Sequence, residues 1–153
     1  MNSFDLKIPP VVVVLGAAWL MWIVPRFLPV GDIQLPAHIF FAILCAAVGV
    51  ITSGLGVMAF RRARTTVNPT KPGATSFLVH SGIYSLTRNP MYLGFVLILC
   101  GWAILLRNVF VFPFPPVFIL YMNRFQIQPE EQALTESFGA TFTGYTVRVR
   151  RWI

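Results

Sequence analysis

Two short motifs in the C-terminal half carry the side chains best suited to chemistry, and the first covers residues 81–92, SGIYSLTRNPMY. Within it, Arg88 and Asn89 stand directly before Pro90. Proline suits the first turn of a helix, and the free backbone N–H groups at such a helix start can bind a carboxylate or another anion. The arginine adds a charged, two-pronged donor. The motif therefore predicts either an anion-binding helix start or simply a basic flank followed by a helix.

The second motif is the acidic pair Glu130-Glu131, which follows Pro129. Such a pair of carboxylates can form part of a ligand site. They can equally be acids that stabilise the positive end of a helix dipole. Taken alone, the pair does not decide between a ligand site and a helix N-terminus.

The elements that must position these motifs are membrane helices. Only 11% of the 153 residues are charged and 56% are hydrophobic, whereas a soluble domain carries roughly 25% charged residues. Lipid must therefore cover much of the surface. We expect an all-α, polytopic membrane helical bundle, a single domain over residues 1–153. Four apolar runs predict the spans, at about residues 8–24, 35–60, 91–106 and 109–122.

The last two spans read as a tight hairpin that turns at Arg107-Asn108, so the two motifs must lie near each other. Pro113, Pro115 and Pro116 fall inside the fourth span, where we expect a packing kink or the wall of a binding cavity. A helix is predicted to start at Pro129. Two short amphipathic helices then lie on the inner membrane face, with an apolar stripe at Leu134, Phe138, Phe142, Tyr145 and Val149.

Basic residues set the expected orientation. Of the twelve Lys and Arg residues, only Arg26 and Arg107 fall in the loops on the second side of the membrane; the other ten share the side of the two termini. This asymmetry predicts an integral membrane protein with both termini in the cytoplasm. The net charge of +7 fits anionic lipid beside the spans, and no groove for nucleic acid is apparent. Cys45 and Cys100 lack metal-ligand spacing, so no metal is expected.

Taken in order, the motifs form a longer pattern: G-x-Y-x-x-x-R-N-P-M-Y-x-G, a hydrophobic hairpin, E-E-x-x-L-x-x-x-F-G and a basic, aromatic tail. This pattern resembles the isoprenylcysteine carboxyl methyltransferase and phospholipid methyltransferase family of integral membrane enzymes. The resemblance covers roughly residues 82–152 and departs from the usual family pattern at Asn89, Phe142 and Arg150, where His, Tyr and Pro are common.

The resemblance implies S-adenosyl-L-methionine as the methyl donor, a cofactor-binding half at residues 80–153 and a lipophilic acceptor at the inner membrane face, such as an isoprenylcysteine carboxylate or a phospholipid amine. The implied cofactor-binding residues are Gly82, Tyr84, Arg88, Asn89, Pro90, Tyr92, Gly94, Glu130 and Glu131. The catalytic candidates are Arg88, Glu131 and Arg148. A carboxylate suits the ammonium of the donor, and a guanidinium suits its carboxylate.

Two other functions stay open at this stage. One is a membrane reductase that uses a nicotinamide cofactor, since sterol reductases have a similar C-terminal arrangement; no glycine-rich dinucleotide fingerprint accompanies it. The other is a small non-enzymatic membrane subunit whose basic loops bind lipid or a partner protein. Binding of the methyl donor separates both from a methyltransferase.

Overall fold

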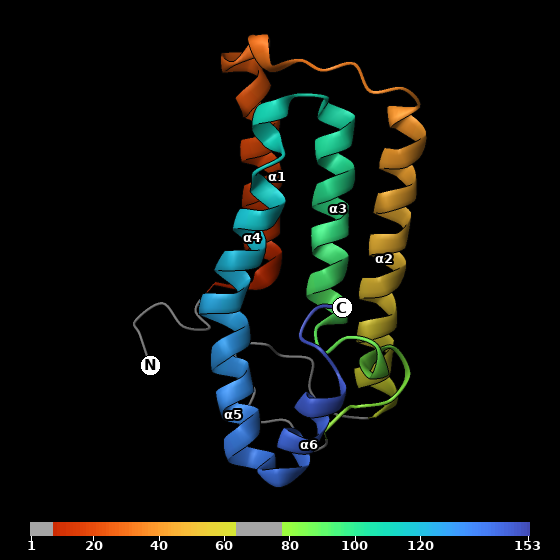
Figure 1. Cartoon of the computed structure of the whole chain (residues 1–153), viewed down its shortest axis with the longest axis vertical. Helices are drawn as coiled ribbons and strands as arrows, with labels where there is room; N and C mark the ends of the chain where they lie inside the picture. Colours follow the sequence, from red (N-terminus) through yellow and green to blue (C-terminus); the bar gives the residue numbers. More distant parts are fainter. Residues whose placement is uncertain (1–7, 64–77) are drawn as a thin grey trace.

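The computed structural model describes residues 8–63 and 78–153, and this part of the chain is helical without a β-sheet. The helices are α1 (Pro10–Phe27), α2 (His38–Arg62), α3 (Pro90–Leu106), α4 (Phe114–Met122), the π-helical segment η5 (Asn123–Ile127), α5 (Gln128–Phe138) and α6 (Ala140–Arg148). Short 3₁₀ turns are η1 (Pro29–Gly31), η3 (Gly82–Ser85) and η4 (Val109–Val111). Figure 1 shows α3 between α2 on one side and α1 with α4 on the other.

Close contact between α2 and α3 depends on small residues. A Cβ at Gly94 would overlap Ser53 Oγ and the carbonyl oxygen of Gly49, and a Cβ at Gly101 would come within 2.7 Å of the Ala42 carbonyl oxygen. The hydroxyl of Ser53 donates a hydrogen bond of 3.0 Å to the Met91 carbonyl. Small residues that let two backbones approach are typical of helix pairs in membranes. This contact fixes where α3 begins relative to α2.

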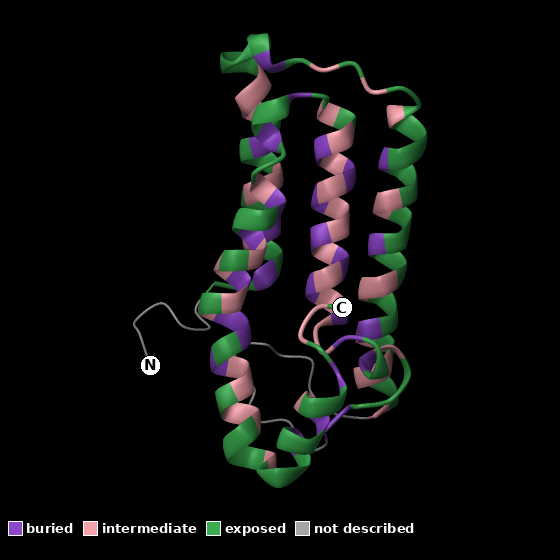
Figure 2. Ribbon diagram, viewed as in Figure 1, coloured by how far each residue is buried: buried purple, intermediate pink, exposed green. Residues whose placement is uncertain are grey.

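Two helices, α1 and α2, are long and apolar enough to cross a membrane, and α3 is a shorter apolar helix beside them. Only 17% of the residues in each long apolar window are buried within the protein. Side chains such as Leu15, Phe40 and Ile51 are instead largely exposed, and Figure 2 shows exposed residues along both helices. Soluble monomeric proteins rarely expose apolar surface of this extent. The expected polytopic membrane bundle is confirmed, and the chain is an integral membrane protein.

The fourth span differs from its expected form. Residues 109–111 form the turn η4, so α4 begins only at Phe114. Pro113 then occupies the N-cap, and Pro115 and Pro116 lie in the first turn. These positions have no helical partner for an N–H group, so the prolines start the helix instead of kinking it.

The helix predicted to start at Pro129 forms as α5, which begins at Gln128 with Pro129 in its first turn, but it is not a separate helix. The helix of α4 continues through η5 into α5, and Figure 1 shows one long rod. Pro129 has no N–H to donate and would disrupt a regular α-helix. The wider π-helical turn directly before it interrupts the regular hydrogen-bond ladder at this place. The carboxylates of α5 are therefore held on a rigid extension of the span.

The turn between α3 and α4 forms where the sequence predicted it. Arg107 adopts the left-handed conformation with φ 51° and ends α3. Asn108 is fully buried, and its side-chain amide donates to the Leu28 carbonyl at 2.9 Å and to Asp32 Oδ1 at 3.3 Å. Its Oδ1 accepts from the Phe110 N–H at 3.0 Å. We call Asn108 with these three partners the hairpin clasp, because it ties the turn to the end of α1.

At the opposite end, residues 78–88 and 140–153 pack together in a layer that we call the cap. Its core consists of Leu78, Phe142, Tyr145 and Val149, with Leu134 and Phe138 of α5 against it. The Tyr145 hydroxyl donates to the Tyr84 carbonyl at 2.6 Å. The apolar stripe predicted for the C-terminal helices thus forms, but it packs against Leu78 of the cap.

Candidate active site

The start of α3 is held by the C-terminal tail. The Arg88 N–H donates to the Arg150 carbonyl at 3.1 Å, and the side chains of Asn89 and Thr87 donate to the Arg151 carbonyl at 3.0 and 3.4 Å. Pro90 is the first residue of α3 and is buried. The tail therefore runs beside the first motif, although more than sixty residues separate the two in sequence.

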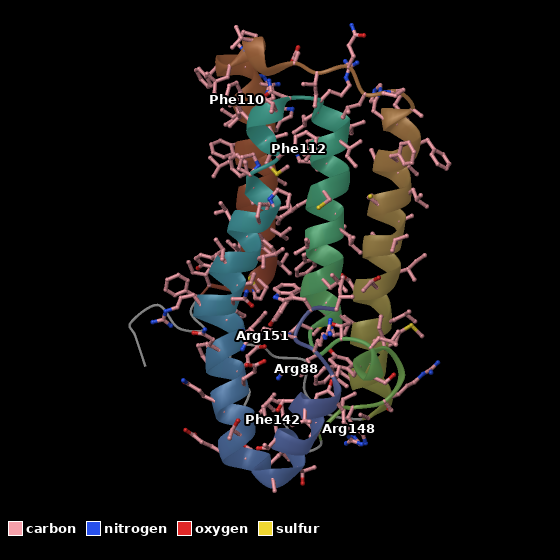
Figure 3. All side chains as sticks on the ribbon, in the orientation of Figure 1. Arg88, Phe110, Phe112, Phe142, Arg148 and Arg151 are labelled. Atoms are coloured by element: carbon pink, nitrogen blue, oxygen red, sulfur yellow. The ribbon has the colours of Figure 1, made fainter. Side chains whose placement is uncertain are left out.

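Glu131 binds two arginines that come from these two segments. Its Oε1 lies 3.0 Å from Arg88 Nη1 and 3.1 Å from Arg151 Nε, and its Oε2 lies 2.6 Å from Arg151 Nη2. Figure 3 shows Arg88 and Arg151 close together beside α5. Both motifs predicted from the sequence meet here, at a site that holds one more positive charge than Glu131 can neutralise.

One donor of this cluster is unused. The Nε of Arg88 is buried and has no hydrogen-bond partner within the described residues. Buried polar atoms are almost always hydrogen-bonded, so an unpartnered donor marks a place where a further acceptor can bind. The structure therefore leaves Arg88 free to bind one more acceptor, such as an anion.

Glu130 points to a different set of partners. Its Oε1 accepts a hydrogen bond from the Tyr92 hydroxyl and another from Gln126 Nε2, both at 2.6 Å. Burial raises the pKa of Glu130 to about 7, against the lowering effect of the two hydrogen bonds, and the neighbouring charge of Glu131 raises it further. Glu130 therefore exchanges a proton near neutral pH, which an exposed glutamate does not do.

The remaining tyrosines of the site stay protonated. Burial raises the pKa of Tyr84 well above its ordinary value, and burial raises that of Tyr145 to about 12, against the lowering effect of Arg88. The Tyr84 ring packs edge-on against Phe60 of α2, with centroids 5.4 Å apart. These residues therefore link the cap to α2 as neutral hydroxyl groups.

Three residues singled out from the sequence lie apart from the cluster. Gly94 packs against α2, as described above. Gly82 is exposed, with φ 63° and nothing within 4 Å of where a Cβ would stand. Arg148 is exposed and donates from Nε to the carbonyl of Gly144 at 3.2 Å; Figure 3 shows it away from Arg88 and Arg151.

Sequence reasoning missed four residues of the site: Gln126, Arg151, Trp152 and Asn123. The Trp152 indole donates to Asn123 Oδ1 at 3.0 Å and so fastens the tail to η5. The spacing of four residues between Gln126 and Glu130 was a usable signal, because such residues meet on one helix face. The partner of Arg151 had no comparable local signal.

A hollow of about 460 Å³ borders the cluster on the side of α5. Its lining consists of Gln128, Glu131, Gln132, Thr135 and Glu136. The volume lies in the range of small-molecule sites, roughly 300–1,000 Å³. Glu131 thus lies both in the ion cluster and at a polar hollow large enough for a ligand.

A known protein and a protein family resemble this chain in sequence. A family model described as phospholipid methyltransferase matches residues 37–141, more than two thirds of the chain. A protein of Haemophilus influenzae, itself described only as uncharacterised, is 41% identical over 63 residues, which is 41% of this chain and all of that protein. No solved structure matches the chain significantly.

The family match confirms the resemblance seen in the sequence and extends it to α2, which the motifs did not cover. It ends within α6, before the tail residues that bind Arg88 and Glu131. The match covers the start of α3 and both glutamates, and the bundle around them is a membrane bundle. The chain therefore belongs to the phospholipid methyltransferase family of membrane proteins.

Proposed function

We propose that this protein transfers a methyl group from S-adenosyl-L-methionine to a lipophilic acceptor at the membrane face where its termini lie. The observation that carries the proposal is the contact of Arg88 with Glu131, which joins the two motifs of the family pattern in one cluster. A non-enzymatic subunit would not need an arginine with a buried, unused donor at that place.

The residues of the cluster fit the groups of such a donor. Its carboxylate suits the unpartnered Nε of Arg88 and the positive end of α3. Its ammonium and ribose hydroxyls suit carboxylates, and Glu131 already borders a hollow of adequate volume. The aromatic face of Tyr92 suits a sulfonium.

When bound, the donor supplies a methyl group on a sulfonium, which an acceptor takes by in-line displacement. The chain has to align the two partners rather than provide a metal or a nucleophile. Arg88 and Arg151 fix the Glu131 carboxylate in one position. Glu130, in its ionised form, accepts the proton of an acceptor that loses one, and Tyr92 and Gln126 hold its carboxylate in place.

Arg148 takes no part in this scheme, because it is exposed and bonds a carbonyl of its own helix. The acceptor approaches from the bilayer, since α1 and α2 present apolar faces to it. Cytoplasmic termini are supported by the arginines: Arg61 and Arg62 end α2 at the cap, whereas Arg26 and Arg107 lie at the end of the hairpin clasp.

The experiment is incubation of proteoliposomes with methyl-labelled S-adenosyl-L-methionine and a set of acceptors: phosphatidylethanolamine, an isoprenylated cysteine, a fatty acid and a small thiol. We expect label in the organic phase with one acceptor class, and little or none with Glu131→Gln. Ser137→Ala, an exposed polar residue on the same helix that does not line the hollow, is the control and keeps activity. Equal label with Glu131→Gln and wild type would contradict the site.

A further inference from the structure

The four arginines of the cap divide into two pairs. The cap contains Arg88, Arg148, Arg150 and Arg151, and no Asp or Glu. Arg88 and Arg151 bind Glu131. Arg148 and Arg150 are exposed and form no ion pair within the described residues. Half of the positive charge of the cap is therefore available to something outside the chain.

The exposed pair continues onto the end of α2. Arg61 and Arg62 close α2 and are also exposed. The cap lies against this end of α2, because η3 packs on α2 and the Tyr84 ring contacts Phe60. Figure 3 shows Arg148 at the end of the molecule where α2 ends. Two segments far apart in sequence thus present four exposed arginines at one end of the bundle.

Three large apolar side chains of the cap are exposed as well. Leu86 is 74%, Val147 83% and Ile153 80% exposed. Single exposed apolar residues are ordinary, but here they belong to a layer that adjoins membrane-spanning helices. Apolar side chains beside arginines with long aliphatic stems are typical of segments that lie at a lipid head-group surface.

We propose that the cap docks on anionic phospholipid head groups of the leaflet where α2 ends, through Arg148, Arg150 and the arginines that end α2. Charge complementarity favours anionic lipid as the partner, because every acidic or basic side chain of the cap is basic. Each arginine near an anionic bilayer strengthens association about fivefold. The exposed side chains Leu86, Val147 and Ile153 enter the interface beside the phosphates.

Docking also acts on the active site, and this part rests on the proposed function. The Arg150 carbonyl accepts from the Arg88 N–H, and the next residue, Arg151, binds Glu131. A phosphate that binds the Arg150 side chain therefore restricts the motion of the tail segment that brings Arg151 to Glu131. Anionic lipid should tighten the binding of the methyl donor without touching it.

The test compares nanodiscs of phosphatidylcholine with nanodiscs that also contain phosphatidylglycerol. Hydrogen exchange of residues 140–153 is measured without any donor, and the affinity for S-adenosylhomocysteine is measured separately. We expect anionic lipid to slow exchange in the cap about tenfold and to tighten S-adenosylhomocysteine binding. In the double variant Arg148→Gln/Arg150→Gln both effects should shrink towards those seen in phosphatidylcholine.

The matched control is Arg26→Gln/Arg107→Gln, which removes two arginines from the other end and should keep the full lipid effect. Exchange that is the same in both kinds of nanodisc for the wild-type chain overturns the inference, and so does an equal loss in the two double variants. Slowed exchange without S-adenosylhomocysteine binding would support docking and contradict the proposed methyl transfer instead.

Discussion

The two ends of the bundle both carry a buried polar cluster, and they differ in what those clusters leave open. At the hairpin clasp, Asn108 is neutral, and its amide nitrogen and oxygen both have partners within the chain. At the start of α3, Arg88 keeps a buried donor without a partner, and Glu130 has a pKa raised to about 7. The first cluster leaves neither the amide nitrogen nor the amide oxygen of Asn108 without a partner, whereas the second keeps a buried donor that has none.

The difference separates a structural role from a functional one. A cluster whose central side chain is satisfied by hydrogen bonds holds two loops together and offers no unused group to a ligand. Ionisable groups with shifted pKa values are typical of sites that bind or transform ligands, and here one lies beside a buried donor without a partner. Changes at the clasp should therefore affect stability alone, and changes at the α3 cluster should affect binding as well.

The largest loss of stability is expected for Glu131→Gln. The change leaves Arg88 and Arg151 facing each other without a carboxylate, and removal of one partner from a buried ion pair costs about 3–5 kcal/mol. Because the Arg151 side chain is 33% exposed, we expect the lower end, about 3 kcal/mol. Unfolding in detergent measures this, with Glu136→Gln as the near-neutral control. A loss as small as that of the control would show that the ion pair is not formed.

A smaller loss, about 2 kcal/mol, is expected for Asn108→Ala. The change removes a fully buried side chain and three hydrogen bonds of the clasp. The same unfolding measurement checks it, with the exposed residue Gln34 replaced by Ala as control. If Asn108→Ala also weakened ligand binding, the two ends would not be independent.

Glu130→Gln sharpens the comparison through pH. An acid whose pKa is raised from 4.5 to about 7 by folding makes the wild type less stable as the pH rises through that window, by at most about 1.4 kcal/mol per pH unit. The amide of Gln does not titrate, so the stability of the variant should not fall in this window. Relative to the wild type, the variant should become more stable between about pH 5 and 7, and the difference should stay constant above about pH 7. Parallel stability curves for the two chains would contradict the raised pKa.

The smallest effect is expected for Tyr92→Phe, about 1 kcal/mol above pH 7. The change removes a donor that favours the ionised Glu130, so the pKa of Glu130 should rise further. Tyr145→Phe is the matched control, because its hydroxyl binds the Tyr84 carbonyl, which does not titrate. Titration of Glu130 followed by unfolding against pH should move with the first change only. A shift of equal size in both variants would show that Tyr92 does not act on Glu130.

Much of the fold could be predicted because each membrane span requires a long apolar run in the sequence. The runs at 8–24, 35–60 and 91–106 became α1, α2 and α3 with ends shifted by a few residues. The long rod from α4 to α5 could not be predicted in this way. Pro129 carries the local signature of a helix start, and only the surrounding packing selects the π-helical turn that lets the helix continue through it.

The site was predictable to the extent that topology brings its parts together. A hairpin turning at Arg107 must place the start of α3 beside α5, so the contact of Arg88 with Glu131 follows from the sequence. The place of Arg151 does not follow, because the chain reverses at Gly139, with φ 49°, and its direction afterwards depends on packing against Leu78. Gly94 was predicted to line the donor site but packs against α2. In the sequence, a glycine that lets a ligand approach cannot be distinguished from one that lets a helix approach.

The most direct test of the account is calorimetric titration of S-adenosylhomocysteine into the detergent-purified chain, with a nicotinamide cofactor as the competing ligand class. Asn108→Ala and Glu131→Gln form a pair in which both chains lose stability. The account predicts saturable binding of S-adenosylhomocysteine by the wild type and by Asn108→Ala, a loss of about 100-fold or more in Glu131→Gln, equivalent to about 2.7 kcal/mol, and no binding of the nicotinamide cofactor. Absence of binding by the folded wild-type chain, or equal binding by both variants, would contradict the assignment of the α3 cluster as the donor site.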